Sequence, residues 1–188
     1  MNDLFSDHKS FNSVISSWDV SNVTDMSRMF SGAKKFNQPL NNWNVSNVTD
    51  MNCMFKYANV FNQPINDWDV SKVTNMKGMF WETAFNQPLN NWNVSSVTNM
   101  SCMFVSATLF NQPLNNWNVS NVTNMDSMFQ STESFNQPIN DWDVSKVTSM
   151  TDMFWGTAFN QPLNKWDVSS VTNTVSYTHL RAHETRSY

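Results

Sequence analysis

The sequence predicts an α/β repeat protein: a right-handed solenoid of about seven 24–25-residue coils, with one short parallel strand and one short helix or helical turn per coil. A tryptophan and a phenylalanine each recur at a nearly constant step along the chain. Within each step, apolar residues follow first a spacing of two and then a spacing of three and four. A fixed period in this range is typical of arrays in which one small unit stacks on itself. The recurring residues are Trp18, Trp43, Trp68, Trp92, Trp117, Trp142 and Trp166, and Phe11, Phe36, Phe61, Phe85, Phe110, Phe135 and Phe159.

The first half of each unit predicts a strand. In the unit that begins at Phe36, Trp43 and Val45 are two residues apart and share one face of an extended segment. Asn42 and Asn44 then point to the opposite face, which is the alternation of a half-buried strand. We expect the tryptophans to stack inward as a core ladder.

The second half predicts a short helix. Met51, Met54, Phe55 and Ala58 follow the i, i+3, i+4, i+7 spacing of one helix face. Asp50 precedes them and is a favourable N-cap residue, because its side chain accepts hydrogen bonds from the first free amides of a helix. The equivalent residues are Asp25, Asn75, Asn99, Asn124 and Ser149.

An asparagine follows the phenylalanine in every unit. We expect its side-chain amide to satisfy backbone groups at the bend between helix and strand, because such groups are costly when buried without a partner. These residues are Asn12, Asn37, Asn62, Asn86, Asn111, Asn136 and Asn160.

Every third unit is one residue shorter than the others and contains an extra tryptophan, Trp81 or Trp155. The segments around these two residues match closely, with one copy starting at Phe80 and the other at Phe154. Duplication of a three-coil block explains this match. The extra ring is interpreted as a cover for surface where one residue is missing. The alternative is an exposed aromatic that binds a ligand.

The domain organisation predicted is a repeat array over residues 1–174 and a tail over 175–188. The array is expected to be a fragment, truncated at both ends. The tail does not fit the repeat and resembles translated adapter sequence, so we expect it to be non-native and disordered. The net charge of −4 offers no basic footprint for nucleic acid, and no apolar run is long enough for a transmembrane helix.

The residues that carry chemistry do not form an enzyme signature. Cys53 and Cys102 lie two coils apart and are predicted to be free thiols, since a disulfide needs closer backbones. His179 and His183 have a spacing that suits zinc on a helix, but no third ligand accompanies them, so no metal site is expected. Paired carboxylates recur at Asp67 with Asp69, and at Asp141 with Asp143. Such pairs serve acid–base work in glycosidases, but solvated surface is the interpretation favoured here. We expect no enzyme activity and no cofactor.

The elements F-N, W-x-V-S and V-T are present in all seven copies. This pattern resembles the BspA-like leucine-rich-repeat surface proteins, and specifically the 25-residue repeat of mycoplasma lipoproteins. The resemblance implies a leucine-rich-repeat-like solenoid, an extracellular or cell-surface location, and adhesion or protein binding. It implies no catalytic residues.

The function expected is therefore non-enzymatic adhesion or binding of a protein or surface glycan. The predicted binding face comprises the outward residues on either side of each tryptophan, in two rows: Asn42, Asp67, Asn91, Asn116 and Asp141, and Asn44, Asp69, Asn93, Asn118 and Asp143. The alternative is a structural spacer without a specific ligand. Regular hydroxyl rows such as Thr49, Thr74 and Thr98 also suit an ice or mineral surface, which is the least favoured of the three functions.

Overall fold

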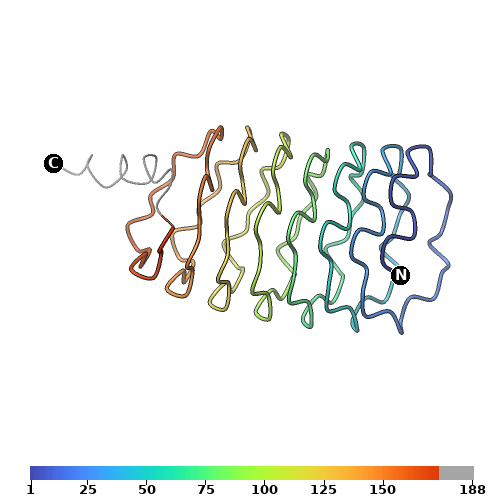
Figure 1. The fold of residues 1–188 in the computed structure, drawn as a ribbon, viewed down its shortest axis with the longest axis horizontal. Coiled ribbons are helices and arrows are strands. Elements are labelled where there is room, and N and C mark those ends of the chain that lie inside the picture. The colour runs from blue at the N-terminus through green and yellow to red at the C-terminus, as the bar shows by residue number, and fades with distance from the viewer. Residues whose placement is uncertain (174–188) are drawn as a thin grey trace.

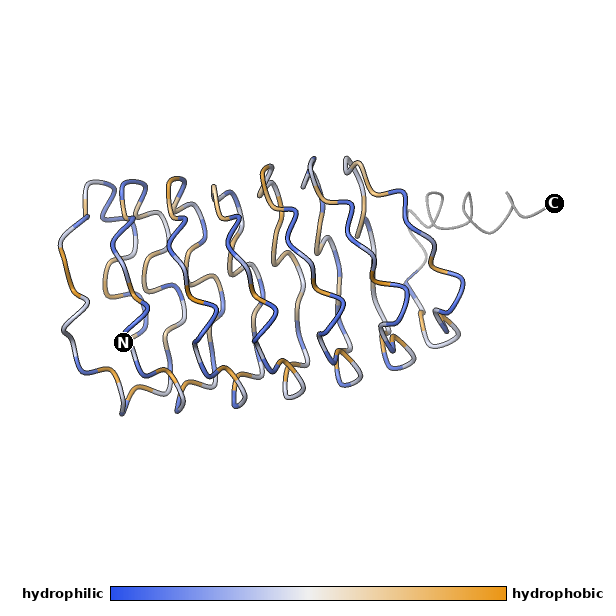
Figure 2. Cartoon of the chain, turned by 180° about the vertical axis from the view of Figure 1, so that it is seen from behind, coloured by the Kyte–Doolittle hydropathy of each residue, from blue (hydrophilic) through white to orange (hydrophobic). Residues whose placement is uncertain are grey.

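The computed structural model describes residues 1–173, which wind into coils stacked side by side along one long axis (Figure 1). Neighbouring coils touch through isolated parallel β-bridges between equivalent residues. The bridges run from Asp25 to Asp50, Asn75, Asn99, Asn124, Ser149 and Asn173 in succession. Apolar and polar residues alternate along each coil (Figure 2), and the buried apolar side chains of the coils form one shared core. The predicted tail, residues 175–188, lies outside the described residues.

The predicted helix and strand of each coil are wrong. Residues 1–173 contain no helix and no strand beyond the isolated bridges, so the fold is not the α/β solenoid that the sequence predicts. In the predicted strand, Trp43 and Val45 are buried while Asn42 and Asn44 are exposed, so the alternation itself is confirmed. An extended, alternating segment is therefore present without the continuous ladder of backbone hydrogen bonds that defines a strand.

Consecutive turns replace the predicted helix. The Met54 amide bonds to the Met51 carbonyl at 3.2 Å, and the Ala58 amide bonds to the Phe55 carbonyl at 2.9 Å. The third residue of each turn, Cys53 and Tyr57, has a positive φ of 53° and 60°. A positive φ at this position is the feature of a type II turn, and it ends any right-handed helix.

Alternate amides of this segment bond to the next coil. Met51, Cys53, Phe55 and Tyr57 donate to carbonyls one coil further on, at 2.7–3.0 Å. In a helix these amides would bond within the segment instead. The segment thus alternates between closing its own turns and joining its neighbour, which explains how neighbouring coils adhere along this segment without strands.

The apolar spacing predicted a helix wrongly because two successive four-residue turns place inward-facing residues at the same intervals as a helix does. Five of the six residues predicted as N-caps do accept an amide, but each caps a turn, as when Asp50 Oδ1 accepts from the Asn52 amide at 2.7 Å. At the sixth, Ser149, the Thr151 amide donates instead to Asp126 Oδ1 of the preceding coil, at 2.8 Å. The glycines are a sequence signal for the turns, because glycine favours the positive φ that these turns require. Gly32, Gly78 and Gly156 all lie at the positive-φ positions, with φ of 72°, 61° and 72°.

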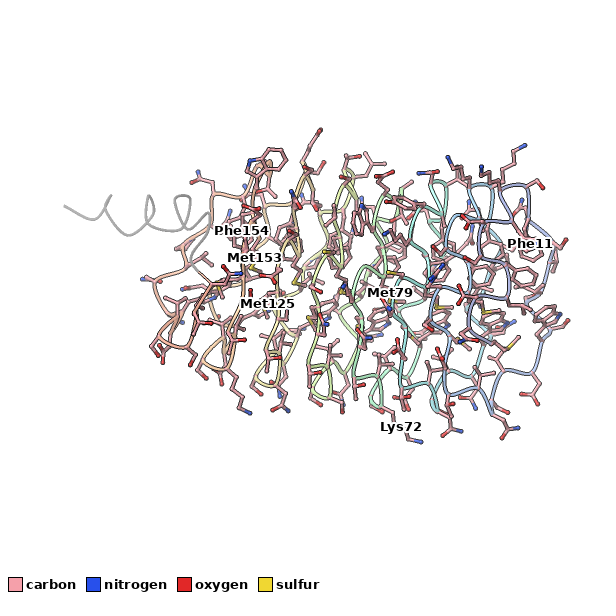
Figure 3. The ribbon with its side chains drawn as sticks, viewed as in Figure 1. Phe11, Lys72, Met79, Met125, Met153 and Phe154 are labelled. Atoms are coloured by element: carbon pink, nitrogen blue, oxygen red, sulfur yellow. The ribbon has the colours of Figure 1, made fainter. Side chains whose placement is uncertain are left out.

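The core is a set of stacked columns, one residue per coil. Phe55 stacks on Phe61 at 3.9 Å within a coil and on Phe80 of the next coil at 5.9 Å. Trp92 and Trp117 are parallel to within 4°, with ring centroids 6.4 Å apart. The methionines share this interior: Figure 3 shows Met79, Met125 and Met153 within the array, whereas Lys72 lies at its outer edge. The tryptophan core ladder that the sequence predicts is therefore confirmed, and only Trp18, at the N-terminal end, is 39% exposed.

The asparagine ladder is also confirmed. The Asn62 amide donates to Asn37 Oδ1 at 2.9 Å, and the same contact recurs from coil to coil at 2.8–3.0 Å. A glutamine from the next coil reinforces it, as when Gln63 Nε2 donates to Asn37 Oδ1 at 3.2 Å. The predicted partner was a backbone group at the bend, and the partner found is the backbone amide of the following asparagine.

Candidate interaction surfaces

The ten residues of the predicted binding face all lie on the surface of the array. Both rows are exposed along their whole length, on the outside of the segment whose inner side holds the tryptophans. We call the two rows, Asn42 to Asp141 before each tryptophan and Asn44 to Asp143 after it, the asparagine face. The structure therefore brings the sequence-predicted residues together on one surface.

The second row is fixed by hydrogen bonds to its own backbone. Asn44 Oδ1 accepts from the Ser46 amide at 3.2 Å, and Asn93 and Asn118 accept from Ser95 and Ser120 at 3.2 and 3.1 Å. This contact, two residues along the chain, is an Asx turn. The side-chain NH₂ of each of these asparagines donates to no other described residue, so it is available to a partner.

The carboxylates of this row have the same geometry. Asp69 Oδ1 accepts from the Ser71 amide at 3.0 Å, and Asp143 Oδ1 accepts from the Ser145 hydroxyl at 2.6 Å and amide at 3.1 Å. Hydrogen bonds from the serine hydroxyl and amide hold the pKa of Asp69 and of Asp143 below the ordinary value. A carboxyl of this kind is a fixed negative charge rather than a proton donor at neutral pH.

The first row links one coil to the next. Asn91 Nδ2 donates to Asp67 Oδ1 at 3.4 Å, and Lys165 Nζ forms an ion pair with Asp141 Oδ1 at 2.6 Å. The carboxylates that the sequence pairs as Asp67 with Asp69 are both exposed.

Hydroxyl groups form a further row beside the asparagine face. Thr49 Oγ1 donates to the Thr24 carbonyl at 3.2 Å, and Thr74 Oγ1 repeats the contact with Thr49. Each of these hydroxyl hydrogens is already used inside the array, so fewer remain for an ice or mineral surface.

Among residues 1–173, no group of three or more His, Cys, Asp or Glu side chains could hold a metal ion. His179 and His183 lie outside the described residues. Cys53 and Cys102 are free thiols, as predicted, and burial raises the pKa of both. Neither thiol is the low-pKa kind that serves as a nucleophile.

The two extra tryptophans have different surroundings. Trp81 is half-buried, and the Lys56 ammonium lies 3.8 Å from its ring centroid, with Tyr57 alongside at 5.9 Å. Trp155 is 55% exposed. The surroundings of Trp81 suit the interpretation as a surface cover. Trp155 is exposed, as the alternative of a ligand-binding aromatic requires.

A model of the family described as "Mycoplasma protein of unknown function, DUF285" matches residues 1–87 and again residues 81–185. The chain belongs to this family. The double match agrees with the repeat organisation of the sequence and with the predicted resemblance to a mycoplasma repeat. The finer resemblance to BspA-like leucine-rich-repeat surface proteins stays a prediction. No curated protein matches the DUF285 chain.

One exposed feature of this DUF285 chain was missed by the sequence reasoning. Outside the end coils, the large apolar side chains exposed among residues 1–173 are Val60, Leu109 and Trp155. Val60 and Leu109 occupy equivalent positions, immediately before the recurring phenylalanine. The signal that could have found them is variation, because this position changes from coil to coil while the asparagine face stays nearly uniform.

Proposed function

We propose that the DUF285 array is a non-enzymatic scaffold that binds a protein or surface glycan through the asparagine face. The observation that carries the proposal is the fixed geometry of the second row, in which backbone hydrogen bonds orient one polar group per coil toward solvent. Rows of this kind present donors from asparagine and acceptors from aspartate at a repeat of about 4.8 Å, the spacing of neighbouring extended chains.

Preorganisation is what makes such a face suited to binding. A flexible side chain loses about 0.5–1.5 kcal/mol of conformational freedom when a partner immobilises it. Asn44, Asn93 and Asn118 have already lost much of this freedom in their Asx turns. A partner that bonds to several coils at once would gain from each of them without ordering each side chain anew.

The proposed location is the outside of the cell or its surface. Support comes from the resemblance to BspA-like leucine-rich-repeat surface proteins, for which adhesion and protein binding are the implied roles. Within residues 1–173, no helix is long and apolar enough to cross a membrane.

A structural spacer is the second candidate, and one observation favours it. The two rows hold asparagine or aspartate in every coil from Asn42 to Asp143, so the surface offers little variation by which to distinguish one partner from another. A spacer requires only that coils stack rigidly, which the core columns provide.

A pair of matched variants separates the two functions. Lys165 already stands in the first row of the last coil, so Asn91→Lys with Asn116→Lys adds two ammonium groups to the asparagine face in a form that the repeat accepts. Beads coated with the full chain would be tested for attachment to cultured cells and to extracellular matrix. We expect wild-type beads to attach and the double variant to lose at least tenfold in bound beads.

The control carries the same added charge at a position outside the two rows. Ser96→Lys with Asn121→Lys uses a position where Lys72 and Lys146 occur naturally. Equal attachment of wild type and control with loss in the face variant supports binding through this surface. Equal attachment of all three would exclude the asparagine face, and no attachment by wild type would favour the spacer.

A further inference from the structure

We propose that two copies of this chain associate through the corner that precedes the recurring phenylalanine, related by a two-fold axis at the coil of Ala84. This goes beyond the proposed function, because it assigns a second surface and a second partner. We call the surface the corner column. It comprises Lys34, Lys35, Val60, Ala84, Leu109 and Glu133, one or two residues from each of five consecutive coils.

The corner column is exposed and held in place. Lys34, Lys35 and Glu133 are exposed, and the exposed fractions of Val60 and Leu109 are 46% and 56%. Backbone contacts connect neighbouring corners: the Ala84 amide donates to the Asn59 carbonyl at 3.0 Å, and the Ser134 amide to the Thr108 carbonyl at 3.2 Å. The side chains of the column are therefore displayed on a rigid support.

Charge is unevenly distributed along the array. Between Lys77 and Lys146 the sequence contains no lysine or arginine. The corner column is basic at Lys34 and Lys35 and acidic at Glu133, and none of these three groups has an ion pair with another residue of the described chain. Exposed charges of opposite sign at the two ends of one surface favour association with a copy turned end for end.

The spacing of the column is symmetric about Ala84. Val60 lies one coil before it and Leu109 one coil after, while Lys34 and Lys35 lie two coils before and Glu133 two coils after. A two-fold axis at Ala84 therefore sets Val60 against the partner's Leu109, and Lys34 and Lys35 against the partner's Glu133. In a two-fold interface each such contact occurs twice, so the surface complements itself.

The coil of Ala84 leaves room for the two copies to approach each other at the two-fold axis. It is one of the shortened coils, and its corner carries the small, half-buried Ala84 where a full-length coil carries two residues, such as Asn59 and Val60. The corner is therefore shortest where the two copies would come nearest, and the apolar side chains of Val60 and Leu109 flank it. Burial of these side chains contributes about 25 cal/mol for each square ångström removed from water.

Charge exchange tests the arrangement. Sedimentation of the full chain at low ionic strength is expected to show a dimer, and high salt should weaken it because ion pairs are screened. Glu133→Lys, and separately Lys34→Glu with Lys35→Glu, set like charges against each other and should each raise the dimer Kd about tenfold or more. An equimolar mixture of the two variants should form a heterodimer, because every opposed pair is then of opposite sign.

Two controls show that any loss of the dimer comes from the corner column and not from unfolding or from a general change in charge. Asp143→Lys reverses a charge on the asparagine face and should leave the dimer unchanged, and near-ultraviolet circular dichroism should show every variant to have native tryptophan packing. A wild-type chain that sediments as a monomer at tens of micromolar overturns the proposal. So do corner variants that dimerise like wild type, or a variant mixture that remains monomeric.

Discussion

The indole Nε1 of Trp68 donates a hydrogen bond of 3.0 Å to the backbone carbonyl of Leu40 in the preceding coil. The same contact links each later tryptophan of the core ladder to a leucine or isoleucine one coil earlier, at 3.0 Å. The side chain that fills the core therefore also fixes the register between coils. This dual role explains why tryptophan recurs where another large apolar residue would fill the same volume.

Replacing this tryptophan tests the register contact. In Trp68→Phe the indole hydrogen bond is lost and a void remains, so we expect the free energy of unfolding to fall by about 1–3 kcal/mol. The matched control is Trp18→Phe in the exposed N-terminal coil, where we expect a change within about 0.5 kcal/mol. Urea unfolding followed by fluorescence measures both, and equal effects would refute the role given to the contact.

The asparagine ladder predicts that the side-chain oxygen at Asn86, as a hydrogen-bond acceptor, is what stabilises the array. Asn86 Oδ1 accepts from the Asn111 amide at 3.0 Å and from Gln112 Nε2 at 3.1 Å. Asn86→Ala leaves that amide unpaired and should cost about 1–3 kcal/mol of unfolding free energy. Asn86→Asp keeps the acceptor and should recover most of the loss in thermal unfolding, whereas an Asp variant as unstable as the Ala variant would contradict the ladder.

Gly78 tests the turn geometry. Its φ is 61°, and a Cβ placed there would lie 3.0 Å from Cys53 Sγ in the preceding coil. Gly78→Ala should therefore destabilise the array by about 1–2 kcal/mol for the left-handed backbone alone, with an added cost from the sulfur contact. In a Cys53→Ala background the added cost should disappear, and a double-mutant cycle measured by chemical unfolding would reveal this coupling.

The aspartates of the asparagine face predict a pH dependence. Hydrogen bonds from Ser71 lower the pKa of Asp69, and those from Ser145 lower the pKa of Asp143. The stabilisation from such groups is present above the unfolded-state pKa of about 3.9 and is lost as the pH falls through the folded-state value. Wild type should therefore lose more stability below about pH 4 than Asp69→Asn with Asp143→Asn. Carbon-detected NMR titration should also show the pKa of Asp69 rising in Ser71→Ala.

Much of the packing could be predicted from the sequence, because burial follows directly from the apolar pattern. Trp68 and Val70 are buried and Asp67 and Asp69 are exposed, as their alternation requires. The asparagine ladder could be predicted because a polar residue at a fixed place in every coil needs a fixed partner. The exposure of the asparagine face followed from the same alternation.

The backbone of the second half could not be predicted from the same pattern. Met51, Met54, Phe55 and Ala58 are buried as a helix would bury them, yet every second amide from Met51 to Tyr57 donates to the next coil. Spacing records which side chains point inward, and it does not record where the amides donate. The corner column could not be predicted for a different reason. Its residues differ from coil to coil, so no repeated residue marks the surface, and Val60 and Leu109 are related only by their equivalent positions in the stacked coils.

The central claim is that turns joined across coils replace the helix in every repeat, and the backbone at Cys53 and Tyr57 tests it most directly. The measurement is the intraresidue amide–Hα nuclear Overhauser effect of these two residues in the folded chain. Their φ angles of 53° and 60° predict a strong effect at both, because a positive φ brings these two hydrogens close together. Weak effects at both residues, with the sequential amide–amide contacts of a continuous helix from Met51 to Ala58, would contradict the claim.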